Sequence, residues 1–263
     1  MSNSSESQSL TFWQHLDVLR GNIIRSLITF ILLSVVAFCF RDLLFQIIIA
    51  PSKPDFITFR MLQRLLGVHV DAHLELINTS LAGQFLVHMR MALVAGLLLS
   101  APYLLFEIMC FVSPALYASE RQVSFRVVGA SYLMFVAGVL VGYLLIFPLT
   151  VLFLGSYQVS ATVDNMITIE SYVDMMMVLL LMLGVMFQLP VISYLLARFH
   201  LLDYKWLTSY RKHAVVAVIC LSAVITPSGD AFTLLITALP LYLLFELSVV
   251  VVRRTNNKYP NNA

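Results

Sequence analysis

Long apolar stretches alternate with short polar segments along almost the whole chain. Four of them have the roughly 20 residues that a helix needs to cross about 30 Å of hydrocarbon, and they cover residues 21–40, 85–109, 123–154 and 171–197. Two more follow at 214–225 and 231–252, the second interrupted by Pro240. A helix rises about 1.5 Å per residue, so the stretch 214–225 reaches only about 18 Å. The pattern predicts an all-α polytopic membrane protein with six transmembrane helices, of which the fifth and sixth are short.

The polar segments between these stretches are small enough for a single six-span membrane domain over residues 1–254. Residues 11–20 alternate with a helical period and predict an interfacial helix before the first span. Residues 41–83 form an outer cap loop in which 55–66 repeat apolar positions at helical spacing. The tail 255–263 is rich in Asn, which predicts disorder.

Composition and charge agree with a membrane location. The chain is 60% hydrophobic and 11% charged, with a mean hydropathy of +0.90, whereas a soluble domain carries about 25% charged residues. Most of the 16 Lys and Arg residues fall on the side that also holds both termini. Because positive residues accumulate in cytoplasmic loops, we expect both termini in the cytoplasm.

Sequence motifs of catalysis are missing. The chain has no nucleotide-binding loop, no GxSxG and no HExxH, so we expect neither an enzyme nor a cofactor. His69 and His73 are four residues apart, but no third ligand lies near them, and no metal site is predicted. No basic-aromatic patch points to nucleic acid.

The most informative segment is the loop after the second span, which reads FVSPALYASER over residues 111–121. Membrane proteins place few ionisable groups beside their spans, and such groups usually have a function. Here a proline ends the span, and Tyr117, Glu120 and Arg121 follow within a few residues. The loop therefore predicts a polar recognition surface at the membrane face.

Several short motifs occur in a fixed order on these spans. They are HL at 15–16 with LR at 19–20, SAPYLLFE at 100–107, FVSPALYASER at 111–121, FPL at 147–149, IESY at 169–172, FQLP at 187–190, TP at 226–227 with Asp230, and LPLY at 239–242. Together they resemble the TatC family, the multispanning subunit of the twin-arginine protein translocase.

This resemblance implies a receptor in the inner (cytoplasmic) membrane that uses the proton-motive force to export folded proteins. It would bind twin-arginine signal peptides, associate with single-span partners of the TatA and TatB type, and self-associate within the lipid bilayer. The residues implied for the signal peptide are Leu19, Arg20, Phe111, Tyr117, Glu120 and Arg121. Those implied for partner docking, on the fifth and sixth helices, are Ala223, Thr226, Pro227, Asp230 and Thr233.

The chemistry of two of these residues suits a paired-arginine ligand. Arginine forms bidentate bonds to carboxylates and stacks on aromatic rings, and Glu120 and Phe111 provide one group of each kind. The alternatives are an ion pair of Glu120 with Arg121 or Arg126, and an interfacial anchoring role for Phe111.

Of four further polar residues, two have two readings. Gln188, in a near-continuous apolar run, either serves function or makes a helix–helix hydrogen bond. Asp230 either docks a partner or caps the sixth helix. Glu107 at the inner end of the second span is a structural partner of an arginine, and Glu246 in the sixth span is also structural.

The chain departs from the family pattern at several positions. Val18 stands where the family has Glu, with Asp17 one residue earlier, and Gln188 replaces a common intramembrane Glu. The outer turn reads TPSGD, one residue longer than TPPD. Leu234 occupies a position that is often polar, with Thr233 and Thr237 as substitutes.

Two other classes of protein remain open from the sequence. One is a proton- or ion-coupled small-solute transporter, which should show convergent ionisable residues in mid-membrane; the chain offers Gln188, Asp174 and little else. The other is a scaffold without transport activity, which would need no carboxylate in a receptor loop.

Overall fold

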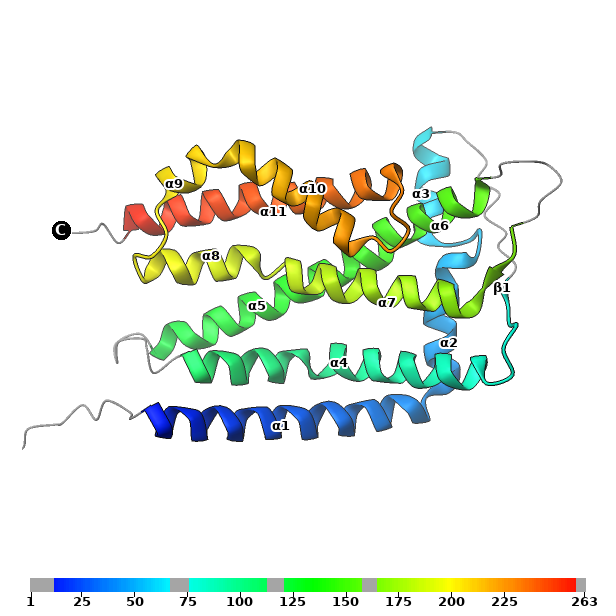
Figure 1. The fold of residues 1–263 in the computed structure, drawn as a ribbon, viewed down its shortest axis with the longest axis horizontal. Coiled ribbons are helices and arrows are strands. Elements are labelled where there is room, and N and C mark those ends of the chain that lie inside the picture. Colours follow the sequence, from blue (N-terminus) through cyan, green and yellow to red (C-terminus); the bar gives the residue numbers. More distant parts are fainter. Residues whose placement is uncertain (1–11, 67–75, 113–120, 158–164, 259–263) are drawn as a thin grey trace, which may run out of the picture.

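The computed structural model describes residues 12–66, 76–112, 121–157 and 165–258. Its long helices run roughly parallel to one long axis, with the start of α1 and the end of α11 at the same end of the bundle, whereas α2 and α3 run across that axis (Figure 1). We call this the terminal end, and the other the loop end. The helices are α1 Phe12–Cys39, α2 Arg41–Ile49, α3 Ile57–Leu66, α4 Gly83–Val112, α5 Arg121–Val141, α6 Phe147–Ser156, α7 Ile169–Met186, α8 Leu189–Arg198, α9 Tyr204–Ser209, α10 Arg211–Ile225 and α11 Ala231–Lys258.

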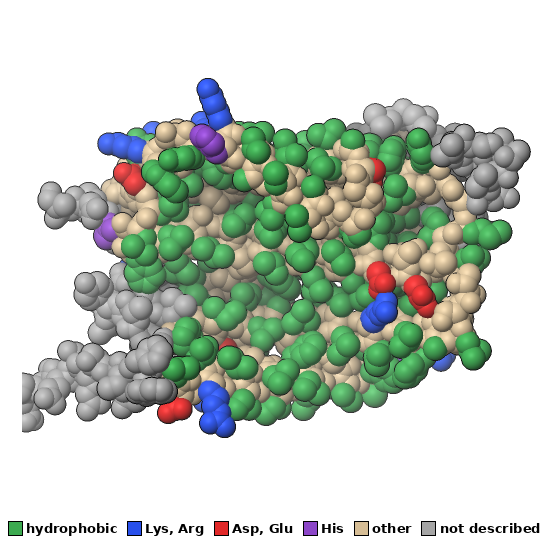
Figure 2. Space-filling view, in the orientation of Figure 1, with side chains coloured by type: hydrophobic (Ala, Val, Ile, Leu, Met, Phe, Trp, Pro, Cys, Tyr) green, Lys and Arg blue, Asp and Glu red, His purple; other side chains and the backbone are tan. Residues whose placement is uncertain are grey.

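Five helical segments are long and apolar enough to cross a membrane in the described part of the chain. They are Leu16–Cys39, Gly83–Phe111, Val127–Ser156, Ile169–Arg198 and Ala231–Asn257. Hydrophobic side chains cover most of the flank that Figure 2 shows, while most charged side chains lie near the two ends. The predicted class, a helical multi-pass membrane protein, is confirmed.

The short fifth helix has the expected form, whereas the sixth does not. Helix α10 has 15 residues and is not among the five segments. Helix α11 has 28 residues and continues past Pro240 to Lys258, so the prediction of a short sixth helix is wrong, as is that of disorder for residues 255–258. Pro240 removes one backbone hydrogen bond, but the apolar residues on both sides keep the helix packed.

The N-terminal segment also differs from its prediction. Residues 12–20 form the first turns of α1 and continue into the span without a break, so they are not a separate interfacial helix. The polar–apolar alternation gave the helical period correctly but could not locate a boundary, because Gly21 does not interrupt the helix.

Two of the long spans are irregular near a proline. The third contains a π-helical turn, η4 (Gly142–Ile146), between α5 and α6. The fourth is broken between α7 and α8 at Phe187 and Gln188. Pro148 and Pro190 follow these breaks within two residues, and each lacks the N–H that a regular helix would bond to the carbonyl four residues earlier.

The loop end is closed by α2, the short 3-10 helix η1 (Ala50–Ser52) and α3, and the assignment of this end to the outer side of the membrane stays a prediction. The Thr58 hydroxyl of α3 donates to the Leu144 carbonyl, which is the carbonyl that Pro148 cannot serve. Tyr143 and Tyr172 donate to the carbonyls of Ile47 and Ile48 at 2.6 and 2.9 Å. A two-residue parallel pairing of β1 (Leu76–Ile77) with β2 (Ile167–Thr168) joins two segments at this end.

The core is built mainly from α6, α7, α11 and η4. Its fully buried side chains include Ile146, Phe147, Met176, Leu183 and Leu241. Helix α1 packs mainly along α4, and much of its apolar surface is exposed. The bundle thus has a dense half around α7 and an open half around α1.

Candidate functional site

A groove of about 390 Å³ lies between α1 and α4 at the terminal end of the bundle. Its walls are nearly all apolar. They are formed by Leu19, Asn22, Ile23, Ser26, Leu27 and Phe30 of α1 and by Leu97, Leu104, Glu107, Ile108 and Phe111 of α4. On α1 these residues recur at three- and four-residue spacing, which places them on one helix face.

The buried carboxylate of Glu107 is the main polar group in this groove. The Tyr103 hydroxyl donates to its Oε1 at 2.5 Å, and Arg25 Nη1 lies 3.8 Å from the same oxygen. The Glu107 side chain is only 6% exposed, whereas that of Arg25 is 65% exposed. Asn22 Nδ2 donates to the Glu107 backbone carbonyl at 3.3 Å. The predicted structural role of Glu107 as an arginine partner is confirmed by this geometry.

The structure brings two of the predicted signal-peptide residues together. Leu19 of α1 and Phe111 of α4 are 92 positions apart in sequence and line the same groove. Arg20 is exposed on the next position of α1, and Arg121 is the first residue of α5. Tyr117 and Glu120 lie outside the described residues. The sequence did not reveal Asn22 and Arg25 as groove residues, although both are polar positions in an otherwise apolar span.

Gln188 occupies the break between α7 and α8. Its Nε2 donates to the Ser131 carbonyl of α5 at 3.0 Å, and its own carbonyl accepts from the N–H groups of Val191 and Ile192. This is the helix–helix hydrogen bond that one of its two readings predicted. Whether Gln188 also serves function stays a prediction.

The predicted partner-docking residues divide into exposed and buried ones. Ala223 and Pro227 are exposed at the α10–α11 turn, whereas Thr226 and Thr233 are buried. The Thr226 hydroxyl donates back to the Ser222 carbonyl at 2.9 Å. Thr226 and Thr233 therefore present no surface to a partner in this conformation, because the chain itself covers them.

Asp230 is the N-terminal cap of α11. Its Oδ1 accepts the Thr233 N–H at 2.8 Å, and its Oδ2 accepts the Thr233 hydroxyl at 2.6 Å. Partial burial acts to raise the pKa of Asp230, but hydrogen bonds from Ser228 and from the hydroxyl and N–H of Thr233 outweigh it and lower that pKa below its ordinary value. The capping reading of Asp230 is confirmed.

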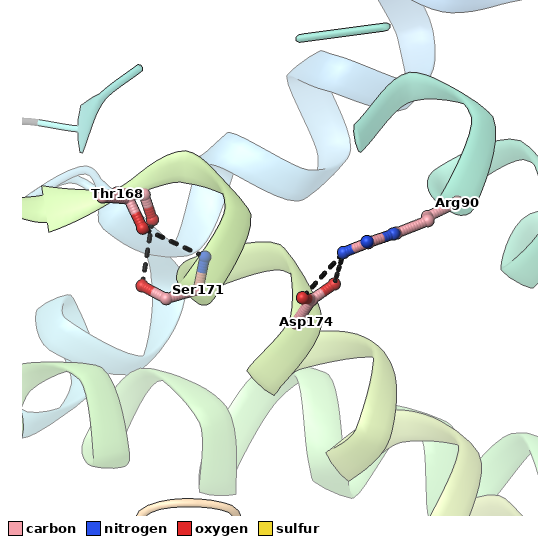
Figure 3. Close-up of polar contacts among 4 residues, drawn as sticks. All are labelled: Arg90, Thr168, Ser171 and Asp174. Atoms are coloured by element: carbon pink, nitrogen blue, oxygen red, sulfur yellow. Dashed lines mark hydrogen bonds and ion pairs between the residues drawn. The ribbon is translucent and has the colours of Figure 1, made fainter. Parts of the chain in front are cut away.

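A second ion pair lies on the flank near the loop end. Arg90 Nη1 of α4 is 2.8 Å from both carboxylate oxygens of Asp174 on α7, and the two side chains point toward each other across the helices (Figure 3). In the same view, Thr168 caps α7 by accepting the Ser171 N–H at 3.3 Å. About half of each charged side chain is exposed. Asp174, considered above as a possible transport group, is thus held by a counter-charge.

Metal chemistry finds no support in the described ranges, where no three His, Cys, Asp or Glu side chains are grouped for an ion. The site is instead a largely apolar groove at one end of a helical multi-pass membrane protein. A family model described as Sec-independent protein translocase protein (TatC) matches residues 14–240. The chain therefore belongs to the TatC family.

Individual relatives agree over nearly the full length. The Sec-independent protein translocase protein TatC of Blattabacterium sp. subsp. Periplaneta americana is 30% identical over 94% of this chain and 96% of that protein. The protein of the same name from Deinococcus radiodurans is 31% identical over 94% of this chain and 87% of that one. A crystal structure of the twin arginine translocase receptor TatC superimposes with a TM-score of 0.75 at 26% identity, covering 92% of this chain and 99% of that one.

Proposed function

We propose that this chain is the receptor subunit of a twin-arginine translocase and binds the signal peptide at the α1–α4 groove and the adjoining loop 113–120. The observation that carries the proposal is the convergence of Leu19 and Phe111 on one apolar groove. A signal peptide combines an arginine pair with an apolar segment. The groove suits the apolar segment, and Glu120 suits the arginines because a carboxylate can bond a guanidinium in bidentate fashion.

The polar groups of the groove support the assignment of the apolar segment to the groove and of the arginine pair to the loop. Glu107 already bonds Tyr103 and faces Arg25, so its carboxylate is compensated. A buried carboxylate with these partners offers little to a second arginine. The arginine pair would therefore bind residues of the loop 113–120 rather than the polar groups of the groove.

For the membrane arrangement we propose six crossings with both termini in the cytoplasm of an inner-membrane protein. Helix α10 would be the short fifth crossing, and the shared end of α1 and α11 supports an even number. Single-span partners of the TatA and TatB type would dock at the exposed residues Ala223 and Pro227. Labelling of a cysteine at position 118 by an outside-only reagent would contradict this orientation.

The decisive experiment measures signal-peptide affinity in detergent for the parent, Glu120→Asp and Glu120→Gln. A charge-assisted bond contributes about 1.5–3 kcal/mol, so Glu120→Gln should bind the Arg-Arg peptide roughly 10- to 150-fold more weakly. The preference for Arg-Arg over Lys-Lys should shrink in the same variant. Glu120→Asp should keep part of the affinity.

Asp55→Asn is the matched control, because it removes an exposed carboxylate at the opposite end of the bundle. It should leave peptide affinity unchanged. If Glu120→Gln binds the Arg-Arg peptide as tightly as the parent, the loop assignment is wrong. A transporter of small solutes is not favoured, since Glu107, Asp174 and Glu246, which lie within the spans, each face an arginine on a separate helix pair.

A further inference from the structure

The terminal end of the bundle carries a second surface, distant from the α1–α4 groove in the fold and formed by α9, the start of α10 and the end of α11. It combines basic and aromatic side chains. We call it the α9 platform and define it by Lys205, Trp206, Tyr210, Lys212, Arg253 and Arg254, all of which are exposed.

Hydrogen bonds hold the parts of this platform together. Asp203 Oδ1 accepts the Lys205 N–H at 3.3 Å and the Asn256 amide at 3.1 Å. The start of α9 is thereby tied to the last turns of α11. Arg253 precedes Asn256 by three residues and so lies on the same face of α11, which places its charge near that of Lys205.

The platform keeps a net positive charge within the described chain. Arg211 pairs with Glu246 at 2.8 Å. The Asp203 carboxylate accepts from neutral N–H donors of α9 and α11 and so offsets one positive charge at most. No carboxylate of the described residues forms an ion pair with Lys205, Lys212, Arg253 or Arg254. These four exposed cations lie at the terminal end of α9, α10 and α11, where they need an anionic partner or water.

The aromatic residues locate this surface at a membrane interface. Trp206 and Tyr210 are 58% and 44% exposed, and their ring centroids are 4.7 Å apart. Exposed Trp and Tyr are typical of the headgroup level of a bilayer. The platform also lies where α8 ends, α10 begins and α11 ends (Figure 1), which is the level at which apolar spans give way to polar chain.

Helix α10 continues the platform into the apolar region along one face. Lys212, Val216 and Ile219 follow one another at four- and three-residue spacing, so a cation is succeeded by apolar side chains along the same stripe. Val216 is 61% exposed and Ile219 is 43% exposed. A ligand that matches this order has an anionic head and a hydrocarbon tail.

We propose that the α9 platform binds anionic phospholipids of the adjacent leaflet, with the headgroup phosphates on the four cations and an acyl chain along α10. Clusters of four or more Lys and Arg residues next to a span attract anionic headgroups. A lipid fits better than an acidic protein segment, because the apolar stripe and the aromatic pair have no role toward a water-soluble acidic chain. This site is separate from the signal-peptide groove and does not depend on its assignment.

The test compares the association of spin-labelled phosphatidylglycerol and phosphatidylcholine with the full-length protein in vesicles. The variant K205Q/K212Q/R253Q/R254Q removes the four cations. Each cation near an anionic surface changes affinity about fivefold, so the preference for phosphatidylglycerol should fall at least tenfold. The preference of the parent should also weaken as salt rises, since exposed charges are screened.

The matched control is R41Q/K53Q/R60Q/R64Q, which removes the same number of cations from the loop end. It should retain the parent's lipid preference. The proposal is overturned if the platform variant keeps that preference or if the control loses as much. It is also overturned if the platform binds a poly-glutamate peptide without selecting phosphatidylglycerol, which would assign it to an acidic protein segment. K205R/K212R should bind like the parent, and its failure would exclude a role for charge alone.

Discussion

Two ion pairs join α4 to neighbouring helices, and they differ in almost every physical respect. Glu107 and Arg25 join α4 to α1 at 3.8 Å, with a buried carboxylate that also accepts the Tyr103 hydroxyl. Arg90 and Asp174 join α4 to α7 at 2.8 Å, with both side chains about half exposed. The closer pair has the more exposed carboxylate. Distance alone therefore does not rank the two pairs by their contribution to stability. The cost of breaking each pair depends on how the residue that remains is solvated.

The largest effect is expected at Glu107. Glu107→Ala deletes a buried side chain and leaves the Tyr103 hydroxyl without its acceptor, so the free energy of unfolding should fall by about 3 kcal/mol. Glu107→Gln keeps an acceptor for Tyr103 and should lose about 1 kcal/mol. Thermal unfolding in detergent measures both. Equal losses in the two variants would mean that the charge of Glu107 matters little.

Arg90→Leu is expected to cost about 2 kcal/mol, because it strands Asp174 among lipid-facing side chains. Exposed apolar residues on the same helices, Met89, Leu93 and Val178, indicate that this flank faces hydrocarbon. The double variant Arg90→Leu/Asp174→Leu should recover most of the loss. A double-mutant cycle measures the coupling energy between Arg90 and Asp174 in the free energy of unfolding. A coupling energy below about 0.5 kcal/mol would show that the pair faces water.

The next effect concerns the cap of α11. Asp230→Ala should lower the free energy of unfolding by about 1 kcal/mol, as for other N-cap residues. Because the folded-state pKa of Asp230 lies below its ordinary value, its charge contributes stability above the unfolded-state pKa of about 3.9, and this contribution is lost as the pH falls through the folded-state pKa. The difference between the parent and Asp230→Ala should narrow in acid. A difference that does not change between pH 7 and pH 3 would contradict the ionised cap.

Gln188→Leu should have the smallest effect on stability. The bond to the Ser131 carbonyl is worth about 0.6 kcal/mol, as is common between membrane helices. Measuring both the stability and the export activity of the variant distinguishes the two interpretations of Gln188. A stable variant that exports poorly would assign Gln188 a function. Full export would leave only the helix–helix hydrogen bond. Ser131→Ala serves as a control, since it keeps the carbonyl that Gln188 uses.

The sequence predicted the spans well because membrane helices are read from long apolar runs, which do not depend on tertiary contacts. It misjudged α11 because Pro240 and the Asn-rich end are local signals for interruption, and packing against α8 and α10 outweighs them. The two-residue β1–β2 pairing was not predicted, since it joins loops 91 positions apart.

The site was only partly predictable for a similar reason. Leu19 and Phe111 were selected from family motifs, and the structure supplied the groove that they share. Thr226 and Thr233 were selected in the same way, yet they are buried. A sequence motif does not indicate which of its residues are exposed at the surface. Asn22 and Arg25 were overlooked since each acts through Glu107, on another helix.

The π-helical turn η4 sets a limit on how the third span can change in length. Such a turn is one residue more than a regular helix would use. Deleting a residue from Gly142–Ile146 would restore the regular helix with little rotation of the segment beyond it, because the wide turn absorbs the extra residue. A deletion within α5 has no such turn to absorb it and would rotate everything beyond it by about 100°. The buried face of α6, formed by Phe147, Pro148, Thr150 and Val151, would then turn away from the core. Over evolutionary time this span can therefore lose one residue at η4, while a single-residue deletion in α5 should be selected against.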